Sequence, residues 1–123
     1  MTPFRGTLAI VVPCFNEAQR LNVRTFQECA AARPELRFVF VNDGSTDASL
    51  AVLRALADRH CCVAVLNLAR NFGKEIAMTA GLDHAAGEAA IVIDADLQDP
   101  PELIETLAAE WRAGYDVVYA QRR

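Results

Sequence analysis

The chain has 123 residues, of which 53% are apolar, and this length and composition suit one folded domain with a real core and exclude a disordered chain. The net charge is −4 with acidic and basic residues interspersed, so the chain has no basic tract of the kind that binds nucleic acid. No apolar run is long enough to span a bilayer, and residues 1–6 lack the apolar core of a signal peptide. The cysteines form no Cys-x-x-Cys pair. We therefore expect a cytoplasmic domain whose thiols are reduced.

Strand and helix patterns alternate from the start of the chain. Residues 8–12 are an apolar run that predicts a first strand, stopped by Pro13. Asn16 is the expected cap of a helix that begins at Glu17 and carries an apolar face. Residues 37–41 then predict a second strand.

The middle of the chain repeats this alternation. Residues 42–47 have the composition of a turn, in which Ser45 or Thr46 is the expected cap of a second helix. A third strand is predicted at residues 63–68. After a polar loop, a third helix is predicted from about Lys74 to Ala86, closed by a glycine.

The last third of the chain contains one more helix between two strands. Residues 90–93 are a short apolar run that predicts a buried fourth strand. Asp99 is the expected cap of a helix with Pro100 in its first position, and Gly114 ends that helix. Residues 117–120 predict a fifth strand.

Strands that alternate with helices of this length predict an α/β fold, a mostly parallel sheet covered by helices on both faces in three α/β/α layers. All strands of such a sheet have their carboxyl ends at one edge. We therefore expect four polar segments to converge there: residues 13–17, 42–47, 70–74 and 94–99.

Two carboxylates follow the fourth strand directly. Asp94 and Asp96 lie one residue apart, so on extended backbone their side chains project to the same side. A hard, oxygen-liganded cation such as Mg²⁺ or Mn²⁺ would relieve their repulsion, and Gln98 could add a neutral oxygen ligand. The alternative is that both aspartates are solvated loop residues and that Asp99 is only a helix cap.

Other charged residues of the four segments suit a nucleotide. Glu17 and Asp43 could accept hydrogen bonds from a base or ribose, although Glu17 would also suit a first helical turn and Asp43 an Asx turn. Arg70 and Lys74 could contact phosphate oxygens or could simply be solvated. Neither a dinucleotide-binding glycine motif nor a P-loop is present in the sequence.

Four motifs together resemble those of family 2 glycosyltransferases. They are Val-Val-Pro-Cys-Phe-Asn-Glu at residues 11–17, Val-Asn-Asp-Gly-Ser-Thr-Asp at 41–47, Asn-Phe-Gly-Lys at 71–74 and Asp-Ala-Asp-Leu-Gln-Asp-Pro-Pro at 94–101. The chain is most similar to the polyprenyl-phosphate branch, which comprises dolichol-phosphate mannose synthases and bacterial undecaprenyl-phosphate sugar transferases.

The resemblance implies that residues 1–123 are a single domain, the amino-terminal donor-binding half of a Rossmann-like GT-A domain. The positions that match the family's base and ribose contacts are Pro13, Phe15, Glu17 and Asp43. The positions that match its polyprenyl-branch loop are Asn71, Gly73 and Lys74. Asp94 and Asp96 match catalytic positions, with Asp94 a donor contact and Asp96 a metal ligand together with Gln98.

By the same resemblance, the whole protein would transfer a sugar from a nucleoside-diphosphate sugar to a polyprenyl phosphate, with inversion at the sugar and with Mg²⁺ or Mn²⁺ as cofactor. It would act at the cytoplasmic face of the membrane and in cell wall biogenesis. The acceptor-binding part of the family's domain would follow residue 123, so we expect this chain to be inactive alone. An unpaired sheet edge would favour a homodimer.

Two alternatives stay open. The chain could bind a nucleotide sugar without transferring it. It could instead be a nucleotidyltransferase, although the glycine-rich basic loop of that class is replaced here by residues 13–17.

Overall fold

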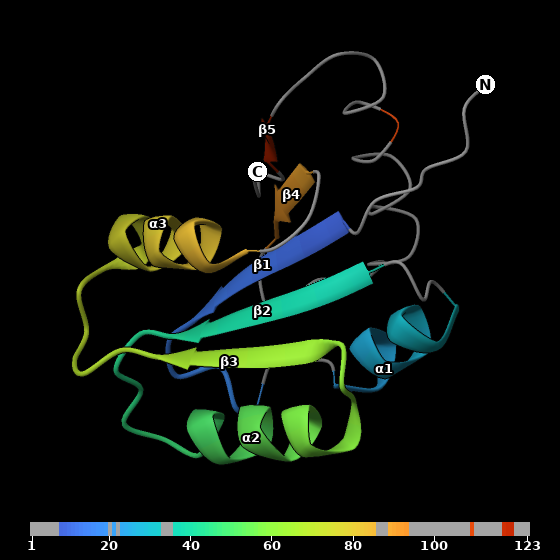
Figure 1. The fold of residues 1–123 in the computed structure, drawn as a ribbon. Helices are drawn as coiled ribbons and strands as arrows, with labels where there is room; N and C mark the ends of the chain where they lie inside the picture. Colours follow the sequence, from blue (N-terminus) through green and yellow to red (C-terminus); the bar gives the residue numbers. More distant parts are fainter. Residues whose placement is uncertain are drawn as a thin grey trace.

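A computed structural model describes residues 8–19, 21, 23–32, 36–85, 89–93, 109 and 117–119. Strands and helices alternate from β1 to β4, as predicted (Figure 1). In chain order they are β1 (Leu8–Cys14), α1 (Val23–Ala32), β2 (Leu36–Asn42), α2 (Ser49–Arg59), β3 (Val63–Asn67), α3 (Lys74–His84), β4 (Ala89–Val92) and β5 (Val117–Tyr119).

The five strands form one parallel sheet in the order β3-β2-β1-β4-β5. Val11 of β1 lies opposite Val39 of β2 on one side and Val92 of β4 on the other. The chain therefore runs outward from β1 to β3 and then returns to the other side of β1 with β4. In open parallel sheets, ligands bind beyond the carboxyl ends of the strands where the winding reverses in this way. The predicted parallel sheet is confirmed.

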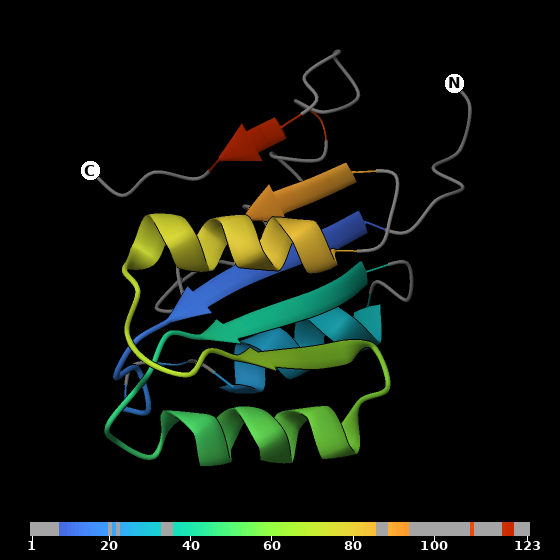
Figure 2. The ribbon, with the colours of Figure 1, turned by 60° about the vertical axis from the view of Figure 1, so that its left-hand side comes forward.

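Helices cover both faces of the sheet. On one face, Phe26 of α1 and Leu53 of α2 belong to a cluster of buried side chains with alternate residues of β1 and β2. On the other face, which α3 crosses in Figure 2, Ala77 packs with Val11 and Val41. The predicted three-layer α/β/α arrangement is therefore confirmed for the described residues.

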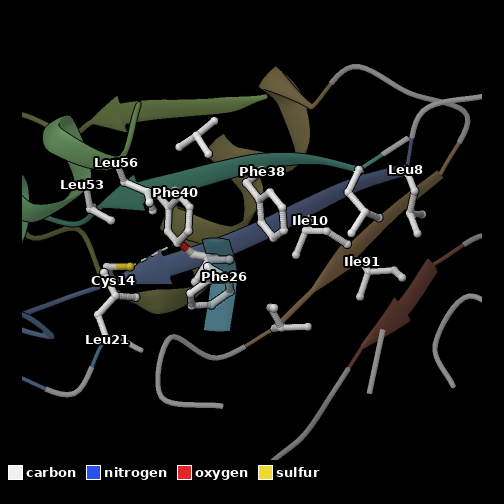
Figure 3. Close-up of a cluster of buried hydrophobic side chains, with 14 residues drawn as sticks. Leu8, Ile10, Cys14, Leu21, Phe26, Phe38, Phe40, Leu53, Leu56 and Ile91 are labelled. Atoms are coloured by element: carbon white, nitrogen blue, oxygen red, sulfur yellow. Dashed lines mark hydrogen bonds between the residues drawn. The ribbon is translucent and has the colours of Figure 1, made fainter. Parts of the chain in front are cut away.

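Three phenylalanines form the centre of the larger cluster (Figure 3). Phe38 and Phe40 are two residues apart in β2, so both side chains point to the same face, where their ring centroids lie 6.1 Å apart. Phe26 meets both rings edge-on, with centroid distances of 5.8 Å to Phe38 and 5.2 Å to Phe40. Such aromatic pairs add about 0.5–1.5 kcal/mol each beyond the burial of their surface.

A glycine lets α3 lie close to the sheet. A Cβ atom on Gly81 would come within 2.4 Å of Val11 Cγ1 and 2.9 Å of Val41 Cγ2. The glycine that interrupts the helical composition therefore has a packing reason. α3 starts at Lys74 as predicted and ends at His84, slightly before the expected end.

The first helix begins later than predicted. α1 starts at Val23 and not at Glu17. Asn16 has a left-handed backbone with φ 52°, and its side chain accepts a hydrogen bond from the N–H of Thr46 instead of capping a helix. The N–H of Leu21 donates to the Glu17 carbonyl at 2.7 Å, which closes a turn ahead of α1. The prediction was wrong because Asn16 serves a contact with a distant loop.

β1 continues through Pro13, which was expected to stop it at Val12. Pro13 lies opposite Val41 of β2, whereas the pairing with β4 ends at Val11. Residues of a central strand alternate between its two neighbours, and the carbonyl of Val11 accepts from the N–H of Ile93 on the β4 side. Pro13 falls on the same side and has no N–H to donate, so the ladder on that side stops here while the pairing with β2 continues to Cys14.

The last third of the chain is described only in part. β5 starts at Val117, as predicted. The helix predicted from Asp99 to Gly114 lies outside the described residues, apart from Ala109, which is helical. Among the helices that the structure describes, none is long and apolar enough to cross a membrane.

Candidate functional site

The loops after β1, β2 and β3 meet at the carboxyl edge of the sheet, as the parallel topology predicted. Backbone hydrogen bonds extend the strand ladders into this edge. The N–H of Asp43 donates to the carbonyl of Cys14 at 2.8 Å, and the N–H of Leu68 donates to the carbonyl of Asn42 at 3.0 Å. Three of the four polar segments are therefore brought together.

Side chains join the loop after β1 to the loop after β2. The N–H of Asn16 donates to Ser45 Oγ at 3.0 Å, and Asn16 Oδ1 accepts from the N–H of Thr46 at 2.8 Å. One residue further on, the N–H of Glu17 donates to Ser49 Oγ at 2.8 Å. These bonds fix the position of the motif at residues 11–17 relative to the amino end of α2.

Asp47 closes the same junction. Its Oδ1 accepts from the N–H of Ser49 at 2.9 Å and from the Ser49 hydroxyl at 2.5 Å, and its Oδ2 accepts from the N–H of Ala18 at 3.3 Å. The hydrogen bond from the Ser49 hydroxyl holds the pKa of the Asp47 carboxyl below its ordinary value. The prediction that Ser45 or Thr46 caps α2 was wrong, because the residue before α2 is Ala48, which makes no side-chain cap.

Asp43 joins the loop after β2 to the loop after β3. Its side chain is only 3% exposed. Oδ1 accepts from the N–H of Phe72 at 2.8 Å, and Oδ2 accepts from the N–H of Gly73 at 3.1 Å and from Asn71 Nδ2 at 3.3 Å. Asn71 Nδ2 also lies 3.1 Å from the carbonyl oxygen of Asp43. Of the residues predicted to bind substrate, Asn71 and Gly73 therefore both donate hydrogen bonds to Asp43.

Gly44 allows the same two loops to touch. Its backbone has φ +68°, and a Cβ atom built on it would lie 2.2 Å from the nitrogen of Asn71 and 2.3 Å from the carbonyl carbon of Arg70. These atoms belong to the main chain, so no rotamer change could make room. The sequence analysis gave Gly44 no functional role. Its position between Asp43 and Ser45 was the feature that could have indicated one.

The other predicted residues of the first loop surround a buried thiol. Pro13 is half-buried at the end of β1, Phe15 is 43% exposed beyond it, and Glu17 is half-buried. Burial, together with the negative charge of Glu17, raises the pKa of the Cys14 thiol to about 12. The Cys14 thiol donates to the Val12 carbonyl at 3.5 Å and is therefore protonated and unreactive at neutral pH.

Cationic and aromatic groups lie around the third loop. Lys74 is the first residue of α3 and is exposed. The Arg70 guanidinium lies 4.2 Å from the centroid of the Phe72 ring, which is 36% exposed. Such a cation–π contact holds the long arginine side chain near one orientation. The sequence reasoning considered Arg70 and Lys74 as phosphate contacts and missed the aromatic partner.

A hollow opens beside the junction of the first two loops. It has a volume of about 450 Å³ and is lined by Asn16, Ala18, Gln19, Asp47 and Ala48. Three of these lining residues, Asn16, Ala18 and Asp47, take part in the hydrogen bonds that join the two loops.

The predicted metal ligands Asp94, Asp96 and Gln98 lie outside the described residues. The chain reaches them from Ile93, which is fully buried and donates its N–H to the carbonyl of Val11 at 3.0 Å. β4 therefore delivers the chain to the carboxyl edge next to β1. Among the described residues, no group of three or more His, Cys, Asp or Glu side chains could hold a metal ion.

Residues 9–123 match a family model described as glycosyl transferase family 2. The chain is 47% identical over 119 residues to an uncharacterized glycosyltransferase, sll0501, of Synechocystis. It is 48% identical over 118 residues to the bactoprenol glucosyl transferase of Shigella phage SfV. These matches cover 94% of the chain but only 37% and 38% of the two relatives.

A solved structure shares the fold. The mannosyltransferase PcManGT of Pyrobaculum calidifontis, in complex with GDP-Man and Mn²⁺, superposes with a TM-score of 0.75 at 28% identity. This match covers 90% of the chain and 33% of the mannosyltransferase.

Proposed function

Because the chain belongs to glycosyl transferase family 2, we propose that it is the donor-binding part of an enzyme that transfers a sugar from a nucleoside-diphosphate sugar to a polyprenyl phosphate. The observation that carries the donor-binding role is the junction of three motif loops at the carboxyl edge, fixed by the hydrogen bonds of Asn16, Asp47 and Asp43. The acceptor class is supported by the name of the bactoprenol glucosyl transferase relative.

The proposed donor site has two parts. Pro13, Phe15, Glu17 and Asp43 belong to the part assigned to the base and ribose. Phe15 offers an exposed aromatic ring to such a group, and Glu17 offers a half-buried carboxylate in the segment before α1. Lys74, exposed at the start of α3, is assigned to the phosphates.

The second part is the acidic segment after β4. Two carboxylates and an amide oxygen (Asp94, Asp96 and Gln98) make a donor set that suits a hard divalent cation. A bound Mg²⁺ or Mn²⁺ ion would supply positive charge against the leaving diphosphate. The relative with bound GDP-Man and Mn²⁺ supports this assignment. Asp96 is proposed as a metal ligand and Asp94 as a donor contact.

The reaction would break the bond between the anomeric carbon and the diphosphate oxygen while an oxygen of the acceptor phosphate bonds to that carbon with inversion. A phosphate is already ionised near neutral pH, so this chain needs no strong general base. The part of the chain described here would bind and orient the donor.

The direct test is donor binding by calorimetry, with UDP-glucose and GDP-mannose as probes and with or without Mn²⁺. We expect Mn²⁺ to tighten the binding of one donor about tenfold or more, because the cation would add positive charge against the diphosphate. Asp96→Ala should lose this gain, whereas Asp83→Ala, which removes an exposed carboxylate of α3, should keep it. Equal Mn²⁺ dependence in all three proteins would reject the metal role of Asp96.

A turnover assay separates transfer from binding alone. The chain spans less than two fifths of either relative, so we expect it to bind a donor without forming product from a polyprenyl phosphate. Product above a control without protein would reject this binding-only reading.

A further inference from the structure

The carboxylate of Asp43 occupies a site that is built like an anion-binding site. Two successive backbone N–H groups, those of Phe72 and Gly73, point at it from the residues directly before α3. The side-chain amide of Asn71 adds a third donor. Consecutive N–H groups at the start of a helix are a common way to bind phosphate, and here they hold an aspartate of the same chain.

We propose that Asp43 is a positioning residue whose buried carboxylate, bound by Asn71, Phe72 and Gly73, holds the loop at residues 70–73 so that α3 presents Lys74 to the donor phosphates. This inference rests on the proposed donor site and deepens it. It assigns the hydrogen-bond donors of Asn71 and Gly73 to a contact within the protein, and it leaves the recognition of donor phosphates at this loop to side chains such as Lys74.

Counting acceptor positions supports this role. A carboxylate offers about four lone-pair positions, and three are taken by hydrogen bonds from the loop. At 3% exposure, little of Asp43 is left for a second partner. A carboxylate with at most one position to offer a nucleotide acts chiefly through the loop that it holds.

Helix α3 needs such a partner. The residue before it is Gly73, which has φ 100° and no side chain to cap the helix. A negative charge near a helix amino end is favourable because the first N–H groups and the helix dipole point toward it. Asp43 supplies this charge from the end of β2, so the start of α3 is tied to the sheet edge.

The first experiment needs no donor. Amide hydrogen exchange is measured by NMR for Phe72 and Gly73 in the unmodified chain and in Asp43→Asn, which places a donor amide where an acceptor is needed. We expect exchange at one or both of these amides to become about tenfold faster or more, because asparagine offers one uncharged acceptor oxygen to the two N–H groups that the carboxylate binds. The amide of Phe40, within β2, should keep its protection. Unchanged exchange at Phe72 and Gly73 would overturn the proposal.

The second experiment is a double-mutant cycle on donor affinity. Asn71→Ala removes one loop donor from an exposed side chain and serves if Asp43→Asn does not fold. If Asp43 and Asn71 both act by holding this loop, Asp43→Asn and Asn71→Ala should each weaken donor binding. The double variant should then bind the donor no more weakly than Asp43→Asn alone. Additive losses would mean that Asp43 contacts the donor directly and would overturn the positioning role. If no donor binds the unmodified chain, the proposed function fails and the exchange result still decides on the loop.

Discussion

Gly44→Ala tests whether the loops after β2 and β3 need the close approach that the structure shows. The added methyl group would lie 2.2 Å from the backbone nitrogen of Asn71, far inside ordinary van der Waals contact. The methyl group also strains the left-handed backbone at φ +68°. To relieve the overlap, the backbone at residues 70–71 would have to move away, and the hydrogen bonds that Asp43 accepts would lengthen or break.

Gly73→Ala is the matched control. Gly73 also has a positive φ, +100°, but a Cβ atom there meets nothing within 4 Å. Backbone strain of this kind costs about 1–3 kcal/mol, so the control should lose that much of its free energy of unfolding. Gly44→Ala should lose the strain energy and also weaken a hydrogen bond to a charged group, which contributes about 1.5–3 kcal/mol, so its total loss should be about 2.5–6 kcal/mol.

Urea unfolding of the three proteins, followed by circular dichroism, measures these free energies. Amide exchange at Phe72 supplies a local readout, which should rise in Gly44→Ala. If Gly44→Ala destabilises the chain no more than Gly73→Ala and leaves Phe72 protected, the two loops do not depend on contact at Gly44, and the reasoning from its geometry is refuted.

Three further predictions concern other parts of the chain. Phe26→Ala should lower the free energy of unfolding by about 3–5 kcal/mol in urea titrations, because a buried ring that meets two others is removed; a loss under 1 kcal/mol would contradict this packing. At pH 8, a thiol reagent should label exposed Cys61 and spare Cys14, whose pKa is about 12, until the chain unfolds. The folded-state pKa of Asp47 is lowered, so its stabilising effect is present above the ordinary value of 3.8 and is lost as the pH falls through the folded pKa. When the free energy of unfolding is measured against pH in acid, Asp47→Asn should therefore lose stability less steeply than the unmodified chain. An identical slope in the two proteins would contradict this.

The layered fold was predictable because it follows from patterns that tertiary contacts seldom override. The apolar run at residues 8–12 predicted the first strand, and the alternation of such runs with helices predicted a parallel sheet. Parallel topology alone then brought the segments after β1, β2 and β3 to one edge. Neither step requires knowledge of which side chains touch.

The roles of single polar residues could not be predicted in the same way. Asparagine is a preferred helix-cap residue, but it also tolerates a positive φ. Both properties come from its short polar side chain, which can hydrogen-bond to nearby backbone groups. The Asn16 side chain accepts from Thr46, 30 positions away in sequence, and nothing in the local pattern distinguishes the two uses. Asp43 was likewise predicted to contact a ligand. In the structure its carboxylate accepts hydrogen bonds from the N–H groups of Phe72 and Gly73, which lie 29 and 30 positions away in sequence.

The bonds at the carboxyl edge have a consequence for binding. Loops that become ordered only when a ligand arrives reduce affinity, because about 1–2 kcal/mol of backbone entropy is lost for each residue fixed. Here Asn16, Asp47 and Asp43 satisfy the backbone N–H groups of neighbouring loops within the chain itself. At the proposed donor site, these bonds would favour binding by fixing the loops beforehand. The exposed side chains of Phe15 and Lys74 are among the groups that we propose to meet the donor.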